Sequence, residues 1–236
     1  MIESTLQIHR KKDAVSGLFR VRSETSDIKA IEEVWKKNSY QRKDFRIGGG
    51  SRWLDLGANV GAFSVYAGLL GNDVMSFEAE PENAKRVVSN MVMNGLRPNV
   101  HQAAIMDDDC ADSHISFYVS SRPMALRRHS VYEPKKDFEK ITVPVVRWST
   151  LPFDQYPNVK MNIEGSEIAL LEQAKSFDGI KKLVFEYSWD KDPSIPRFNR
   201  IIEKLRGHFR EVTHNKKIPP VQAWPYYPPN IFVYCR

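Results

Sequence analysis

Cysteine is scarce in this chain: Cys110 and Cys235 are the only two among 236 residues. They lie too far apart in the sequence to form a metal-ligand pair, and they provide no disulfide framework, so we expect a reducing compartment and a cytoplasmic location. Long apolar runs are also missing, so the sequence predicts no membrane-spanning helix. Residues 1–22 mix charges with isolated apolar side chains and lack the apolar core of a secretory signal.

The composition is that of an ordinary soluble globular protein, with 42% hydrophobic and 27% charged residues. The length suits one α/β domain with a small appendage. The net charge of +6 and the pI near 9.2 permit an acidic partner such as nucleic acid. Because modestly basic enzymes are common, a solvated basic surface is the simpler interpretation.

Strands and helices alternate in the first half of the chain. Apolar runs at residues 53–56, 74–77 and 100–105 predict strands, and the segments 62–70 and 81–93 between them predict helices. Such alternation is typical of a parallel, doubly wound sheet. Ligands of these sheets bind beyond the carboxyl ends of the strands.

The rest of the chain adds smaller signals around this unit. Residues 1–50 are expected to form a helical N-terminal lid, with a helix after Ser26, and residues 51–236 the main domain. Residues 120–140 form a long basic loop. Further strands are expected at 115–119, 141–146, 159–163, 183–185, 212 and 231–234, and further helices at 166–174 and 198–205.

A glycine turn follows the strand at 53–56. Gly57 and Gly61 allow the backbone to take positive φ or to pass close to a ligand, and amides at the start of the next helix can face a polar group. Glu78 ends the next strand, where a carboxylate can accept hydrogen bonds from ribose hydroxyls. Together they predict a pocket for a nucleoside-bearing cofactor.

The spacing favours S-adenosylmethionine over a dinucleotide. A dinucleotide fingerprint needs a second glycine that lets the backbone meet the pyrophosphate, but Asn59 stands there. Asp55, two residues before Gly57, would repel a pyrophosphate, whereas it could hold an ammonium group through a water or the backbone. S-adenosylmethionine carries an ammonium group and no phosphate.

Several motifs occur in the order typical of one known family. Residues 55–64 resemble motif I of class I S-adenosylmethionine-dependent methyltransferases, and residues 77–83, 94–96, 160–167 and 183–186 resemble the narrower FkbM-type family. The resemblance covers about residues 50–190. It implies an α/β, Rossmann-like class I methyltransferase fold, with a seven-stranded, mostly parallel sheet and a reversed C-terminal hairpin. It also implies O-methylation, often of sugar hydroxyls in glycans or natural products.

The resemblance assigns roles to individual residues. The cofactor-binding set would be Asp55, Gly57, Ala58, Asn59, Gly61, Glu78, Ala79 and Asp107. Within it, the turn around Gly57 would line the methionine part, Glu78 would hold the ribose, and Asp107 would reach the adenine amino group. Asn162 and Glu164 would lie beside the transferred methyl group.

Asn162 departs from the family pattern, which usually has aspartate there. An amide can orient a hydroxyl group but cannot take its proton. Glu164 is therefore the first candidate for the catalytic base and His129 the second, although Glu164 could instead stabilise the turn and His129 could be an exposed loop residue. Glu164 and Glu186 could also bind Mg²⁺, but two glutamates without an aspartate support a metal site weakly.

Three functional hypotheses follow. The leading one is an O-methyltransferase whose acceptor is a hydroxyl of a glycan or small molecule. The second is a nucleic-acid methyltransferase. The net charge favours it, but this sequence lacks the Asn/Asp-Pro-Pro-Tyr motif of amino methylation. The third is a cofactor-binding protein without catalysis, which Asn162 would explain. The basic residues that favour the second hypothesis are Arg127, Arg128, Arg197, Arg200, Lys204, Arg206 and Arg210.

Overall fold

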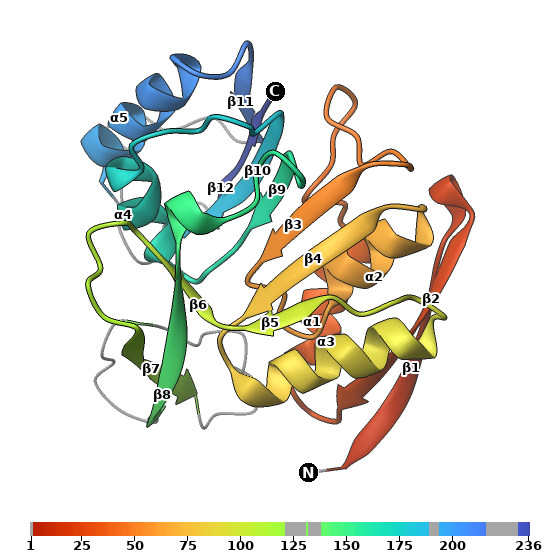
Figure 1. Ribbon diagram of the computed structural model, residues 1–236. Coiled ribbons are helices and arrows are strands. Elements are labelled where there is room, and N and C mark those ends of the chain that lie inside the picture. Colours follow the sequence, from red (N-terminus) through yellow and green to blue (C-terminus); the bar gives the residue numbers. More distant parts are fainter. Residues whose placement is uncertain (1, 121–130, 132–137, 189–193, 216–230) are drawn as a thin grey trace.

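The computed structural model describes residues 2–120, 131, 138–188, 194–215 and 231–236. Its main sheet contains strands β3 (Arg52–Leu56), β4 (Asp73–Glu78), β5 (Val100–Gln102), β9 (Asn158–Met161), β10 (Lys182–Tyr187), β11 (Val212–His214) and β12 (Ile231–Cys235). They form a seven-stranded sheet in the order β11-β12-β10-β9-β3-β4-β5 (Figure 1). In this sheet β10, β9, β3, β4 and β5 are parallel to one another, whereas β12 runs antiparallel to both of its neighbours, β10 and β11. This topology confirms the predicted Rossmann-like fold with its reversed C-terminal hairpin.

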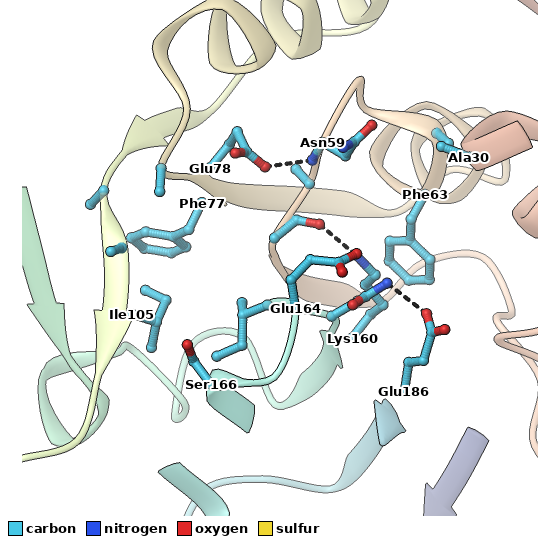
Figure 2. A pocket seen from close by; sticks show the side chains of 18 of the residues that line it. Ala30, Asn59, Phe63, Phe77, Glu78, Ile105, Lys160, Glu164, Ser166 and Glu186 are labelled. Carbon is cyan, nitrogen blue, oxygen red and sulfur yellow. Dashed lines mark hydrogen bonds between the residues drawn. The ribbon is translucent and has the colours of Figure 1, made fainter. Parts of the chain in front are cut away.

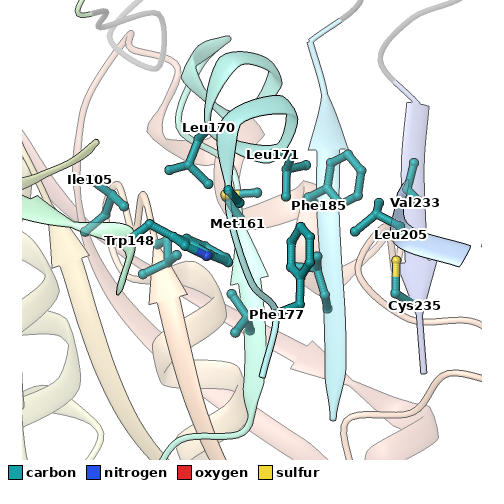
Figure 3. Packing of buried hydrophobic residues seen from close by; sticks show 14 of the residues in the cluster. Ile105, Trp148, Met161, Leu170, Leu171, Phe177, Phe185, Leu205, Val233 and Cys235 are labelled. Carbon is teal, nitrogen blue, oxygen red and sulfur yellow. The ribbon is translucent and has the colours of Figure 1, made fainter. Parts of the chain in front are cut away.

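Helices cover both faces of the sheet. Helices α1 (Asp27–Trp35), α2 (Ala62–Leu69) and α3 (Pro81–Met93) share one apolar core, whereas α4 (Ser166–Gln173) and α5 (Ile195–Arg206) belong to another. Strand β3 contributes side chains to both cores. Trp53 packs in the core of α1, α2 and α3, whereas Leu54 and Leu56 pack in the core of α4 and α5. Figure 3 shows the second core, where Leu171 and Leu205 pack near Phe185. Each such side chain contributes about 1.5–3 kcal/mol when buried.

The N-terminal region contains the expected helix, α1, but is not wholly helical. Strands β1 (Glu3–Arg10) and β2 (Val15–Arg22) pair as an antiparallel hairpin around a short 3₁₀ turn, Lys11–Asp13. This hairpin was not predicted from the sequence. The alternation in β1 was hidden because Arg10 is buried on the same strand as Ile8. Its guanidinium donates to the carbonyls of Val34 and Trp35 at the end of α1.

The strand expected at residues 100–105 is divided. Its first part is β5, and its second part, β6 (Ala104–Met106), leaves the main sheet to pair with β8 (Phe138–Arg147). Strand β7 (His114–Ser120) completes this three-stranded sheet, and the 3₁₀ turn Trp148–Thr150 follows β8. Most of the basic loop expected at 120–140 lies outside the described residues. No helix in the described part of the chain is both long and apolar enough to cross a bilayer.

Candidate active site

A cavity lies at the carboxyl ends of the central strands (Figure 2). Residues 57–59 follow β3, Glu78 and Ala79 come from the end of β4, residues 162–164 follow β9, and Glu186 lies near the end of β10. Helix α1 and the segment after it add further lining residues, of which Tyr40 is the largest. The structure thus brings the glycine turn and the sequence-predicted catalytic candidates Asn162 and Glu164 to one cavity.

The glycine turn is held tightly against the end of β9. Gly57 has φ +77°, and a Cβ atom there would lie 1.8 Å from the carbonyl oxygen of Asn162. The amides of Gly57 and Ala58 both donate to the carbonyl of Phe77. Gly61, with φ +81°, is the N-cap residue of α2. The sequence needs glycine at Gly57 because any side chain would collide with the neighbouring backbone.

Asp55 lies beneath the turn and is not among the described residues that line the cavity. Its fully buried carboxylate accepts hydrogen bonds from Lys160 Nζ at 2.8 Å and from Ser64 Oγ at 2.6 Å. Lys160 Nζ also donates to the Gly57 carbonyl at 2.8 Å and lines the cavity. Lys160 and Ser64 thus occupy the two oxygens of Asp55, and the role expected of Asp55 at the methionine end stays a prediction.

Glu78 closes the opposite end of the turn. Its carboxylate accepts from the amides of Asn59 at 2.7 Å and Glu80 at 2.9 Å. Burial raises the pKa of Glu78 to about 7, although the two amide donors oppose this shift. Asn59, Glu78 and Ala79 line the cavity, and their roles in holding the cofactor stay predictions.

Asp107 lies elsewhere. It lines an adjoining hollow beside Ile105 and accepts from the amide of Asp109 at 3.0 Å, and it is not among the described lining residues of the main cavity. The chain leaves the main sheet between β5 and β6, so the strand that ends just before Asp107 is β6 and not a strand of the main sheet. The corresponding wall of the main cavity is apolar instead, and Phe77, Ala103 and Ile105 contribute to it.

Asn162 joins two other polar side chains on the far wall. Its Nδ2 donates to Glu186 Oε2 at 2.6 Å and to the Tyr40 hydroxyl at 3.3 Å. Burial is the main cause that raises the pKa of Tyr40 well above its ordinary value, so this hydroxyl stays protonated. Asn162, Tyr40 and Glu186 all line the cavity.

Glu164 also lines the cavity, from a tight turn before α4 (Figure 2). Glu164 has φ +55° and Gly165 has φ +104°. Glu167 stabilises this turn, because its buried carboxylate accepts from the amides of Gly165 at 2.8 Å and Ser188 at 2.9 Å. In these two bonds it is Glu167, and not Glu164, that accepts from the backbone amides of the turn. His129 lies outside the described residues.

Ser166 is the first residue of α4 and follows Gly165, which occupies the N-cap position. The Ser166 hydroxyl is buried and has no hydrogen-bond partner among the described residues. Nor do three His, Cys, Asp or Glu side chains in the described ranges come together as a potential metal site. Glu186, one of the two glutamates considered for Mg²⁺, is instead bound by the amide of Asn162.

Lys160 and Tyr40 are among the lining residues to which sequence reasoning gave no role. Lys160 had a detectable signal, since a lysine inside an otherwise uncharged central strand needs a buried partner. Tyr40 had none, because its contact with Asn162 spans 122 positions of sequence.

The charge of the cavity suits a cationic ligand. Its described lining contains the acids Glu33, Glu78, Glu164 and Glu186 but only Lys160 as a base, and Asp55 already pairs with that lysine. An anionic pyrophosphate would face net repulsion here, whereas a sulfonium with an ammonium group would not. The site therefore fits S-adenosylmethionine better than a dinucleotide.

Comparisons with known proteins give one family match. The model of the methyltransferase FkbM domain matches residues 55–212. No curated protein matches the chain.

Solved structures are similar to this chain at low sequence identity. M. jannaschii TYW2 in complex with AdoMet has 14% identity and a TM-score of 0.47, covering 99% of this chain and 85% of its own. The Pyrococcus abyssi tRNA (uracil-54, C5)-methyltransferase in complex with S-adenosyl-L-homocysteine has 12% identity and a TM-score of 0.45, with coverages of 97% and 43%. The precorrin-6y C5,15-methyltransferase of Geobacter metallireducens has 12% identity and a TM-score of 0.43, with coverages of 92% and 91%.

Proposed function

Because this chain belongs to the FkbM methyltransferase family, it is an S-adenosylmethionine-dependent methyltransferase, and we propose that it methylates a sugar hydroxyl of a glycan or a glycosylated small molecule. The observation that carries the proposal is the acidic wall of the cavity. Glu164 and Glu186 form this wall together with Asn162, which follows β9 and donates to Glu186. Carboxylate and amide oxygens accept hydrogen bonds from hydroxyl groups, so this wall suits a neutral, hydroxyl-rich acceptor.

The cofactor would lie along the other wall. Ala58 and Asn59 would face its methionine part, Glu78 its ribose hydroxyls, and the apolar wall at Phe77 and Ile105 its adenine ring. Bound there, S-adenosylmethionine supplies a methyl group on a positively charged sulfur. The protein then has to hold the acceptor oxygen in line with that methyl group and remove the hydroxyl proton.

The N-terminal region is proposed to cover this cavity as a lid. Ala30, Glu33 and Val34 of α1 line the cavity, as does Tyr40. The Trp35 indole donates to the carbonyl of Ala62 at 3.1 Å and thereby ties α1 to the start of α2. A lid in this position would exclude water from the methyl group during transfer.

The basic residues of α5 give little support to a nucleic-acid acceptor. Arg197 and Arg200 both bind the carboxylate of Glu172, and Lys204 donates to the carbonyls of Glu172 and Ala174. These cations stabilise the contact between α4 and α5. The acidic lining of the cavity would, in addition, repel phosphates near the transferred methyl group.

A transfer assay tests the proposed acceptor class. The whole protein is incubated with S-adenosylmethionine carrying a tritiated methyl group and with separate pools of oligosaccharides, glycosylated small molecules and total RNA. Base-stable label in a sugar pool is the expected result. Label in RNA alone, with binding that weakens steeply as salt rises, would replace the proposal with the nucleic-acid hypothesis.

A further inference from the structure

We propose that Glu186 is the general base of the transfer, and that Asn162 is the positioning residue that holds its carboxylate towards the acceptor. This inference rests on the proposed function, since it needs a hydroxyl acceptor. It moves the base from Glu164, which the sequence favours, to the end of the neighbouring strand β10. It also gives a reason for the asparagine at position 162.

The contact between the two side chains is short and directional. Asn162 Nδ2 lies 2.6 Å from Glu186 Oε2, and its other contact, with the Tyr40 hydroxyl, is 3.3 Å long. Both residues sit at the ends of paired parallel strands, β9 and β10. A carboxylate fixed on a rigid strand by a neutral N–H donor keeps a defined direction while it stays able to accept a proton.

Glu164 is placed by a turn and not by a strand. Glu164 and the following Gly165 both have positive φ, after β9 has ended. The amide bonds that stabilise the turn go to Glu167. Glu164 therefore suits contact with the acceptor or the cofactor, whereas Glu186 has the fixed geometry that proton transfer needs.

Asn162 matters because of what an aspartate would do in its place. Two carboxylates at this distance of 2.6 Å would have to share a proton or bind a cation, because two negative charges so close together repel each other strongly. A shared proton would remove the base, and a cation would make the reaction metal-dependent. The amide of Asn162 avoids both outcomes, because it donates to Glu186 and carries no charge of its own.

The proposed step conserves atoms and charge. The acceptor oxygen forms a bond to the methyl carbon while the bond from that carbon to sulfur breaks, and the electron pair of the broken bond stays on sulfur. The hydroxyl proton moves to the Glu186 carboxylate and then to solvent. The products are a methyl ether and S-adenosylhomocysteine.

Activity variants form the first arm of the test, with the oligosaccharide pool as the probe acceptor. E186Q should lose at least about 100-fold in transfer rate and bind S-adenosylhomocysteine with unchanged affinity by calorimetry. E164Q should lose less, and E203Q, an exposed acid on α5, should match the wild type. If the wild type is active and E186Q keeps its rate, Glu186 is not the base. If the wild type labels no sugar, the proposed acceptor class is overturned and the base with it.

The pH profile separates a base from a merely structural residue. The described titratable groups that line the cavity together with Glu186 are Tyr40, Lys160, Glu33, Glu78 and Glu164, of which Tyr40 and Glu33 come from the N-terminal region. The wild-type rate should rise with pH along a limb that E186Q loses and E164Q keeps. A limb that survives in E186Q would overturn the proposal.

Metal binding tests the role of Asn162 without any acceptor. N162D should bind Mn²⁺ at least tenfold more tightly than the wild type, measured from the free-ion signal in electron paramagnetic resonance, because two adjacent carboxylates are suitable oxygen ligands. The double variant N162D/E186Q should lose this gain. No gain in N162D would show that the two side chains do not share a site, and would overturn the positioning role.

Discussion

The two walls of the cavity are built in different ways. The wall proposed to hold the cofactor, called the cofactor wall, lies at the ends of β3 and β4 and is made from backbone close in sequence: the turn at Gly57 donates to Phe77, and Asn59 donates to Glu78. The wall proposed to hold the acceptor, called the acceptor wall, lies at the ends of β9 and β10 and depends on side chains distant in sequence, as in the contact between Asn162 and Tyr40. Fixed backbone suits a cofactor that the whole family shares, whereas side chains can change with the acceptor.

The largest expected effect concerns the point where the two walls meet. In Gly57→Ala the new Cβ would overlap the Asn162 carbonyl, at 1.8 Å, in a residue with positive φ. We expect a loss of more than about 4 kcal/mol in the free energy of unfolding, or no folded protein. Urea unfolding of Gly48→Ala is the control, since nothing lies within 4 Å of a Cβ there. Similar stability of both variants would contradict the idea that the walls are locked together.

The charge beneath the cofactor wall should come next. Lys160→Met leaves Asp55, which is 0% exposed, without its cationic partner. Removing one member of a buried ion pair costs about 3–4 kcal/mol, which urea unfolding can measure. The double variant Lys160→Met/Asp55→Asn should recover part of this loss. If it recovers nothing, Lys160 acts by another route, such as its bond to the Gly57 carbonyl.

Glu78 predicts a pH effect on the cofactor wall alone. Its folded-state pKa of about 7 lies above the ordinary value of 4.5, so the folded state binds the proton more tightly than the unfolded state. The stability from this proton is fully present below about pH 4.5 and is lost as the pH rises through 7. Relative to E78Q, the cofactor-free wild type should therefore lose about 2–3 kcal/mol between pH 5 and pH 8. An unfolding difference that does not change with pH would contradict this.

The contrast between the walls also explains what could be predicted from the sequence. The strands around Gly57 and Glu78 follow local apolar periodicity and turn chemistry, so the fold and most of the cofactor wall could be predicted. Failures arose where distant contacts decide the structure. The β1–β2 hairpin was missed because Arg10 is an inward charge, and the division of the strand before Asp107 was missed because β6 pairs with β8 instead of β4. Tyr40 reaches Asn162 across the fold, which no local pattern encodes.

The smallest expected effect would sharpen the comparison from the acceptor side. Tyr40→Phe removes only the 3.3 Å hydrogen bond with Asn162 and keeps the ring packed against Phe63 and Phe232. Such a long bond contributes about 0.5 kcal/mol, so the unfolding free energy should hardly change. The affinity for S-adenosylhomocysteine should stay the same, while transfer to the sugar pool should fall about twofold as Asn162 gains freedom. A loss of S-adenosylhomocysteine affinity in this variant would show that Tyr40 serves the cofactor wall, and that the two walls are less separate than their construction indicates.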